Sequence, residues 1–184
     1  LMIAELNKNK NHIQVINAIG SLKKSYSNIK LICIGDGNMM QSLKKEIISK
    51  DLQNDIFMLG YREDVNELIN ISDIGILMSY REGLPRNIME FMACGRKVIA
   101  TNIRGCRDLV CNENVGILVK VGDFDATAKA IEKYYLLKDK TFRIPDEIIK
   151  YDIKSVNKEL LKIYEEIELG INSERGISSY VSSR

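Results

Sequence analysis

The chain has 184 residues, of which 45% are hydrophobic and 28% are charged, and its formal net charge is +2. This balance is typical of one folded globular domain, and it excludes a mostly disordered or collagen-like chain. So small a net charge gives no support for nucleic acid as a partner. Residues 1–50 nevertheless carry eight lysines against Glu5, Asp36 and Glu46. That excess allows an anion site near the start; the alternative is a lysine-rich helix face in contact with water.

Cysteine and histidine usage bears on metal binding and on the cellular compartment. Cys33, Cys94, Cys106 and Cys111 form no CxxC pair, and His12 is the only histidine. Structural zinc sites use closely paired ligands, so we expect no metal. Scattered thiols are typical of a reducing compartment, and no apolar run has the length of a membrane span. We therefore expect a cytoplasmic location, which includes peripheral attachment at the inner face of the plasma membrane.

Apolar segments alternate with amphipathic segments along the chain. Consecutive apolar residues predict strands at Met2–Glu5, Lys30–Ile34, Ile56–Leu59, Ile74–Ser79, Val98–Thr101 and Gly116–Val119. Apolar residues at helical spacing predict helices at His12–Tyr26, Met39–Lys50, Glu63–Ile71, Pro85–Cys94, Asp123–Leu137 and Ser155–Leu169. Strands that are apolar on consecutive residues are buried on both faces. The predicted fold class is α/β, with a doubly wound, mainly parallel, six-stranded Rossmann-like sheet.

The domain organisation follows from the same pattern. We expect one Rossmann-like domain at residues 1–169 and a flexible tail at 170–184, where the helical period is lost and Ser and Gly are frequent. The chain opens with Leu1 before Met2, directly in strand-like sequence. We therefore expect it to be one part of a longer protein.

The segment Ser79–Glu90 carries the strongest indication of a binding site. It follows the most apolar predicted strand, and ligands of doubly wound sheets bind at the carboxyl ends of the strands. It also begins a helix, whose unpaired N–H groups and positive dipole end attract anions such as phosphate. The expected backbone donors are Gly83, Leu84 and Arg86. Glu82 and Glu90 flank these donors, and a carboxylate accepts two hydroxyl groups at once, as a ribose or hexose requires. The alternative is a charged loop without a ligand.

Residues 82–105, EGLPRNIMEFMACGRKVIATNIRG, resemble the signature of the retaining group 1 glycosyltransferases, with two glutamates separated by seven residues. Weaker resemblances follow in the family's order at Glu5–His12, Ile34–Gly37, Phe57–Tyr61 and Gly116–Asp123. This family has two Rossmann-like domains that face each other across a cleft, the GT-B fold. The chain resembles the C-terminal domain, and within the family it resembles enzymes of bacterial capsular and exopolysaccharide biosynthesis.

The resemblance implies roles for particular residues. Lys10 would neutralise the diphosphate of the donor, and Glu82 would contact the donor sugar; these are the expected catalytic residues. Glu90 would bind the ribose hydroxyls. The other expected donor-binding residues are Gly83, Leu84, Arg86, Gly35, Tyr61 and Arg62, with Tyr61 and Arg62 beside the base.

The implied activity is transfer of a hexose from a UDP- or GDP-linked sugar to an acceptor hydroxyl. Negative charge develops on the leaving diphosphate, and Lys10 with the helix amides would stabilise it electrostatically without a metal or other cofactor. The acceptor, a glycan or a lipid-linked glycan, would bind mainly to an N-terminal domain that is absent from this chain. We therefore expect the chain alone to have little or no transferase activity.

The chain departs from the family in its first loop, and two other functions stay open. Ala4-Glu5 stands where the family usually has Gly-Arg, so one phosphate-binding cation is missing unless Lys8 or Arg86 supplies it. A nucleotide-sugar epimerase-like domain would share the fold but would be expected to bring more histidines. A non-catalytic α/β binding or signalling module would need clustered acids after its first strand if it were a phospho-receiver, and Glu5 is alone there.

Overall fold

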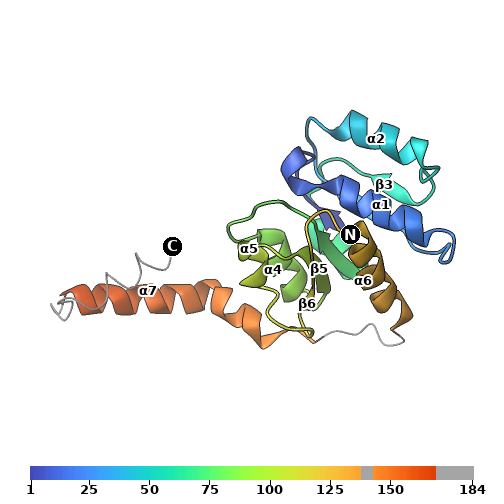
Figure 1. The fold of residues 1–184 in the computed structure, drawn as a ribbon. Helices are drawn as coiled ribbons and strands as arrows, with labels where there is room; N and C mark the ends of the chain where they lie inside the picture. Colours follow the sequence, from blue (N-terminus) through green and yellow to red (C-terminus); the bar gives the residue numbers. More distant parts are fainter. Residues whose placement is uncertain (138–142, 169–184) are drawn as a thin grey trace. The chain divides into compact units, whose positions relative to one another are not determined.

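A computed structural model of the chain describes residues 1–137 and 143–168 (Figure 1). The chain divides into two compact units, Leu1–Asp146 and Glu147–Arg184. The tail predicted at 170–184 lies outside the described residues.

The described part of the first unit contains six parallel strands in two three-stranded sheets. In their order across the sheets, they are β1 (Met2–Ile3), β2 (Leu31–Ile34) and β3 (Ile56–Met58), and β4 (Ile74–Leu77), β5 (Lys97–Thr101) and β6 (Gly116–Val119). Hydrogen bonds join the sheets where β1 begins: the Leu1 amino group donates to the Ile74 carbonyl at 2.9 Å, and the Ile76 N–H donates to the Leu1 carbonyl at 2.8 Å. The spatial order is then 3-2-1-4-5-6, the order of the Rossmann fold. The predicted α/β sheet of six parallel strands is confirmed.

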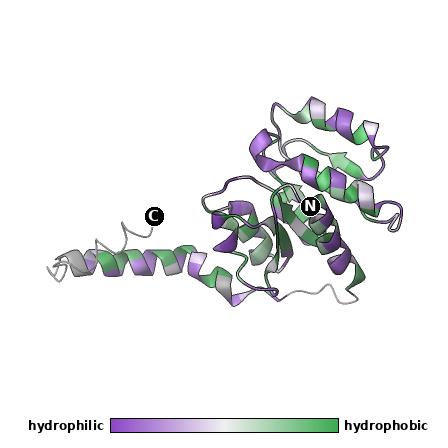
Figure 2. Cartoon of the chain, in the orientation of Figure 1, coloured by the Kyte–Doolittle hydropathy of each residue, from purple (hydrophilic) through white to green (hydrophobic). Residues whose placement is uncertain are grey.

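Helices connect the strands and cover them. They are α1 (His12–Leu22), α2 (Met40–Ser49), α3 (Val65–Ile71), α4 (Arg86–Ala93), α5 (Arg104–Arg107) and α6 (Phe124–Leu136), with a short 3-10 helix η1 (Lys8–Lys10) before α1. In Figure 1, α4 lies on one side of β5 and β6, and α6 lies on the other. Figure 2 shows the strands as mainly hydrophobic and the helices as two-sided. Residues 98–101 of β5 are accordingly all buried, because helices cover both faces of the strand.

One buried side chain fixes α1 to the turn that leads into α6. The Gln14 amide nitrogen lies 3.1 Å from the Lys120 carbonyl and 3.0 Å from the Thr127 hydroxyl, both as acceptors. Its oxygen accepts the Gly122 N–H at 2.7 Å. Only 3% of Gln14 is exposed, so these bonds satisfy polar atoms that cannot reach water.

The structure differs from the predicted elements mainly at their ends. Several strands and helices end one to four residues short of their predicted bounds, because the residues beyond these ends take part in turns. Three short elements, η1, α5 and the 3-10 helix η2 (Asp146–Tyr151), were not predicted, because three to six residues carry no measurable period. Asn11 precedes α1 as its N-cap, in the left-handed conformation. Its side chain donates to the Gln14 side chain at 2.8 Å, so that side chain caps no backbone N–H of the helix.

The described part of the second unit consists of most of η2 (Asp146–Tyr151) and of α7 (Ile153–Glu168). Exposed apolar side chains recur along α7 at helical spacing, at Ile153, Val156, Leu160 and Tyr164. The predicted amphipathic helix is confirmed, and it begins two residues before Ser155. Within residues 1–137 and 143–168, no helix combines the length and the apolar character that crossing a membrane requires.

Gly35 holds the ends of β1 and β2 close together. It follows β2 with φ of +133°, and a Cβ atom there would lie 2.1 Å from the Ala4 carbonyl oxygen. Its N–H donates to the Gly60 carbonyl at 2.9 Å, which brings in the end of β3. A side chain would therefore force apart backbone groups that are hydrogen-bonded to one another.

Gly35→Ala is expected to lower the free energy of unfolding by more than about 3 kcal/mol, because backbone strain and a backbone clash act together. Gly122→Ala is the matched control, since Gly122 has φ of +81° but nothing within 4 Å of its Cβ position. Strain alone predicts a loss of about 1 kcal/mol there. Urea unfolding followed by circular dichroism measures both values. Equal losses of unfolding free energy in the two variants would contradict the predicted effect of the clash.

Candidate functional site

The candidate site lies where β1 and β4 end. These strands are neighbours in the sheet order, and the connections from them lead to opposite halves of the sheet. In a doubly wound fold this arrangement opens a crevice at the carboxyl ends of the two strands. The loop after β1 carries Lys10, and the loop after β4 carries Glu82.

Lys10 and Glu82 form an ion pair across this crevice. The Lys10 Nζ atom lies 2.5 Å from Glu82 Oε1, and the two side chains are 21% and 13% exposed. The residues are 72 positions apart in the chain, so only the fold brings them together. The structure therefore places side by side the two side chains that the sequence predicts to be catalytic.

Asn9 joins the same two loops. Its side-chain nitrogen donates to the Arg81 carbonyl at 2.9 Å, and its side-chain oxygen accepts the Arg81 N–H at 3.1 Å. The Tyr80 N–H also donates to the Asn9 carbonyl at 2.8 Å. Sequence reasoning missed this residue, because an asparagine in a polar loop gives no indication of a partner 72 residues away.

The loop after Glu82 ends at the start of α4, as the sequence predicts. Within the described residues, the N–H groups of Gly83, Leu84 and Arg86 donate no hydrogen bond. No heavy atom lies within 4 Å of the position of a Gly83 Cβ, so the space beside this backbone is open. Pro85 precedes the helix in extended conformation as its N-cap. The start of α4 thus offers backbone donors to an anion.

Glu90 lies one turn into α4. It is four residues after Arg86, so both side chains project from one face of the helix. The Glu90 carboxylate is partly exposed and has no hydrogen-bond or ion-pair partner among the described residues. No hydrogen bond or ion pair between described residues joins it to Lys10 or Glu82. Asn87 fixes the helix start to the sheet, because its side-chain nitrogen donates to the Ile3 carbonyl of β1 at 2.7 Å.

Gly35, Tyr61 and Arg62 belong to the same edge of the sheet. Gly35 bonds to Gly60, and Tyr61 follows with 76% of its surface exposed. The Arg62 guanidinium donates two hydrogen bonds to Asp64, of 2.8 and 2.6 Å, and these lower the pKa of the Asp64 carboxyl. Tyr61 is therefore open to a ligand, whereas Arg62 already has a carboxylate partner.

Two further residues, Gly105 and Cys106 of α5, pack against the Glu82 loop. A Cβ at Gly105 would lie 2.2 Å from the Gly83 carbonyl and 2.6 Å from the Glu82 carbonyl. Burial raises the pKa of Cys106 to about 12, with a smaller contribution from the negative charge of Glu82. Cys106 therefore stays a neutral thiol beside the site. The sequence indicates Gly105 only as part of the family signature, and it gave no role for either residue.

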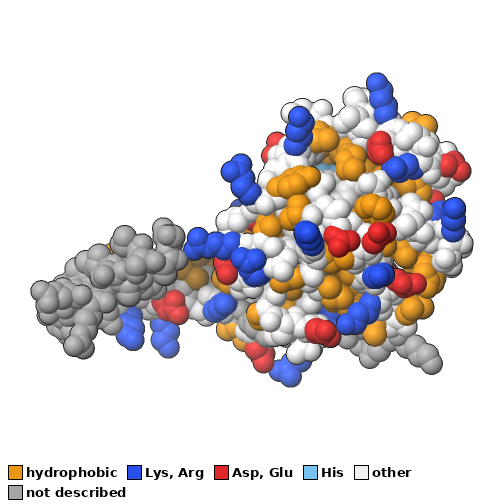
Figure 3. Space-filling view, in the orientation of Figure 1, with side chains coloured by type: hydrophobic (Ala, Val, Ile, Leu, Met, Phe, Trp, Pro, Cys, Tyr) orange, Lys and Arg blue, Asp and Glu red, His pale blue; other side chains and the backbone are white. Residues whose placement is uncertain are grey.

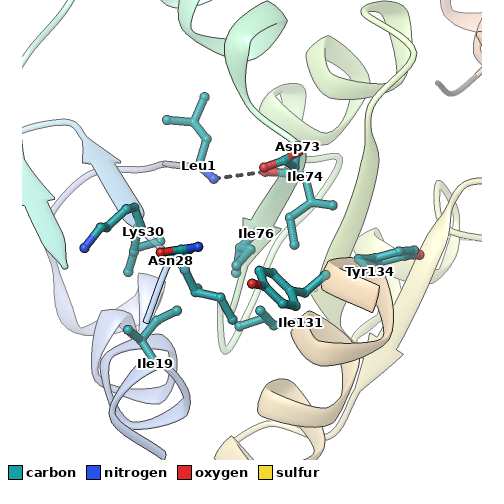
Figure 4. A pocket seen from close by; sticks show the side chains of 12 residues that line it. Leu1, Ile19, Asn28, Lys30, Asp73, Ile74, Ile76, Ile131 and Tyr134 are labelled. Atoms are coloured by element: carbon teal, nitrogen blue, oxygen red, sulfur yellow. Dashed lines mark hydrogen bonds between the residues drawn. The ribbon is translucent and has the colours of Figure 1, made fainter. Parts of the chain in front are cut away.

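The other end of the sheet has a cavity of about 320 Å³ (Figure 4). Its lining comes from the amino ends of β2 and β4 and from α1 and α6, and includes Ile19, Ile74, Ile131 and Tyr134. The site residues lie at the carboxyl ends of the strands, so this cavity is a separate feature.

Figure 3 shows Lys and Arg side chains interspersed with Asp and Glu over the visible face. Across the described ranges, no three His, Cys, Asp or Glu side chains gather as metal ligands.

A family model described as "Glycosyl transferases group 1" matches residues 1–154. This chain belongs to that family. The EpsD protein of Bacillus subtilis is 36% identical over 132 residues, which are 72% of this chain and 35% of EpsD. An α-1,4-N-acetyl-D-galactosaminyltransferase of Campylobacter jejuni, named for a substrate linked to PP-undecaprenol, is 30% identical over 180 residues, or 91% of this chain and 48% of that enzyme.

Solved glycosyltransferases share the fold. HepE of Anabaena, crystallised in complex with UDP, superimposes with a TM-score of 0.80 at 23% identity, over 90% of this chain and 48% of HepE. A glycosyltransferase of Rickettsia africae gives a TM-score of 0.80 at 27% identity, over 94% of this chain and 48% of that protein. The chain thus spans about half the length of these relatives, or less. The predicted family and the predicted Rossmann-like half of the GT-B fold are confirmed, and neither an epimerase-like domain nor a non-catalytic module is favoured.

In this member of the group 1 family, His12 is buried at the start of α1, two residues after Lys10. Only 2% of its surface is exposed, and neither ring nitrogen has a hydrogen-bond partner among the described residues. Burial and then the positive charge of Lys10 lower its pKa from 6.5 to about 4. His12 is therefore neutral at pH 7.

Acid is expected to destabilise the chain through His12. The unfolded chain binds a proton at this histidine near pH 6.5, whereas the folded chain binds it near pH 4. The contribution of neutral His12 to the free energy of unfolding is therefore fully present above pH 6.5. It is lost as the pH drops towards 4, by about 3 kcal/mol in total. His12→Phe keeps an aromatic ring and removes the titration, so its free energy of unfolding falls less over this range. Denaturant unfolding at pH 7.5, 6, 5 and 4 measures the difference, and parallel curves for both proteins would contradict it.

Proposed function

We propose that this chain is the donor-binding half of a retaining glycosyltransferase, which transfers a hexose from a nucleoside diphosphate sugar to an acceptor hydroxyl. The observation that carries the proposal is the Lys10–Glu82 pair of 2.5 Å at the junction of β1 and β4. Family membership supports the reaction class, and the unpaired amides at the start of α4 support the binding of phosphate.

The chemistry of this transfer suits the groups at the site. The bond between the sugar C1 and the diphosphate oxygen breaks, and C1 forms a new bond to the acceptor oxygen, whose proton is released. C1 acquires oxocarbenium character, while the diphosphate gains negative charge. In our proposal Lys10 stabilises that charge, and Glu82 contacts the sugar. Positive charge from Lys10 and from the α4 amides makes a metal ion unnecessary in this proposal.

The proposed donor is a UDP-linked sugar, with a GDP-linked sugar as the alternative. HepE, which shares the fold, was crystallised with UDP and with UDP-glucose. In our proposal the ribose hydroxyls bind Glu90, the base lies beside Tyr61 and Arg62, and the backbone of Gly35 borders the nucleotide. The exposed ring of Tyr61 offers an apolar face for stacking.

The proposed acceptor is a glycan or a lipid-linked glycan of a bacterial surface polysaccharide pathway. Relatives support this class: the Campylobacter enzyme is named for a PP-undecaprenol substrate, and CapM of Staphylococcus aureus is named for capsular polysaccharide biosynthesis. The relatives' additional length would supply the acceptor domain. We accordingly propose activity at the cytoplasmic face of the plasma membrane, and little or no turnover by this chain alone.

Lys10→Ala is expected to weaken UDP binding about 30-fold, because a charge-assisted contact to the diphosphate is lost and Glu82 is left without its cation. Uridine, which lacks the diphosphate, should bind both proteins equally. Lys24→Ala is the matched control, since Lys24 is exposed and follows the far end of α1. Calorimetric titration with UDP, GDP and uridine in the presence of EDTA provides the measurement. UDP binding that needs a divalent cation, or that survives the loss of Lys10, would count against the proposal.

Glu90→Ala is expected to remove recognition of the ribose hydroxyls. The unmodified chain should bind UDP about tenfold more tightly than 2′,3′-dideoxyuridine diphosphate, because a carboxylate accepts both hydroxyl groups. The variant should bind the two ligands alike. Glu67→Ala, at an exposed glutamate of α3, should keep the preference. The role of Glu90 would be refuted by a preference that persists in its alanine variant.

A further inference from the structure

We propose that Asn9 is a positioning residue, which sets the place of Lys10 opposite Glu82 and thereby the affinity for the diphosphate. The inference rests on the proposed function, because it concerns the same site. It assigns a role to a residue outside the two-glutamate signature and next to the lysine.

The Asn9 side chain makes two hydrogen bonds to the Glu82 loop. Its side-chain amide donates to the carbonyl of Arg81 at 2.9 Å and accepts the N–H of the same residue at 3.1 Å. The backbone bond from Tyr80 to Asn9, of 2.8 Å, lies directly beside this pair. Three hydrogen bonds within two consecutive residues restrict both the distance and the rotation of one loop relative to the other.

The Lys10–Glu82 ion pair lies directly next to the Asn9–Arg81 contact in the chain. Lys10 is the residue after Asn9, and Glu82 is the residue after Arg81, so each charged residue is one peptide unit from the contact. Apart from the ion pair, these three bonds are the only hydrogen bonds between residues 4–11 and residues 79–85 in the described part of the chain. The lysine side chain is long and has many rotamers. Fixing the backbone at Lys10 therefore reduces the range of positions that its ammonium group can occupy.

The chemistry of the contact requires an amide. A carboxamide donates and accepts at the same time, and the backbone of Arg81 needs one partner of each kind, an acceptor for its N–H and a donor for its C=O. Aspartate has nearly the same shape, but as a carboxylate it accepts only. It would leave the Arg81 carbonyl without its donor and add a negative charge next to the phosphate site. Asn9→Asp therefore tests the hydrogen-bond pattern at nearly constant volume, and Asn9→Ala tests removal of the whole contact.

The experiment measures UDP and uridine affinities by calorimetry for the 184-residue chain and for its Asn9→Ala, Asn9→Asp and Lys10→Ala variants. It includes the double variant that combines Asn9→Ala with Lys10→Ala. Thermal unfolding is recorded for each protein. Asn66→Ala is the matched control, because Asn66 is an exposed asparagine of α3.

We expect Asn9→Ala to weaken UDP binding about tenfold and to leave uridine binding and the unfolding temperature nearly unchanged. Asn9→Asp should weaken UDP binding at least as much. In the Lys10→Ala background, Asn9→Ala should change UDP affinity less than twofold, because the residue acts through the lysine. Asn66→Ala should bind like the unmodified chain.

Each other outcome contradicts a defined claim. If Asn9→Ala weakens uridine and UDP alike, or lowers the unfolding temperature in step with affinity, Asn9 is structural and the inference is wrong. If the unmodified chain prefers UDP to uridine and Asn9→Ala keeps that preference, the inference is wrong while the proposed function stands. If the unmodified chain has no preference for UDP over uridine, the proposed function is wrong, and the inference falls with it.

Discussion

The candidate site depends on the lateral contact between β1 and β4. These strands begin more than 70 residues apart in the chain, and the hydrogen bonds between Leu1 and β4 set them side by side. The chain proceeds from β1 towards β2 and β3, and from β4 towards β5 and β6, so the loops after β1 and β4 meet without a strand between them. This geometry gives Lys10 and Glu82 a common location, and it leaves the start of α4 open beside them.

Much of the fold could be predicted from the sequence, because parallel strands buried on both faces produce apolar runs that no other element matches. Gly116–Val119 was predicted with the bounds that the structure shows. Helix ends were less predictable: α1 stops at Leu22, because the Lys24 N–H makes no helical hydrogen bond within the described residues and the chain enters a turn, in which Ser25 and Tyr26 both donate to the Leu22 carbonyl. The short helix α5 has too few residues for a periodic signal, although it packs against the Glu82 loop.

The site was predictable in part. The two-glutamate spacing and the helix start gave Glu82 and the backbone donors, and the family resemblance gave Lys10. Side-chain bonds to a distant backbone leave no local trace, so Asn9 was missed. The sequence also could not show that Arg62 is held by Asp64. Gly35 was expected to bind the donor, but the neighbour that requires glycine there is the Ala4 carbonyl of this chain. Gly105, for which the sequence predicted no role, likewise has the Gly83 carbonyl as its neighbour.

The short contact between Lys10 and Glu82 also bears on which anions the crevice would admit. Without a ligand the two opposite charges compensate each other, so this pair adds little net charge to the crevice. An arriving anion must replace a carboxylate as the partner of the ammonium group. Chloride or acetate, with a single charge, gains little in that exchange. A pyrophosphate group carries more charge and offers more oxygen atoms to donors such as the helix amides, so the competing Glu82 carboxylate selects against singly charged cellular anions.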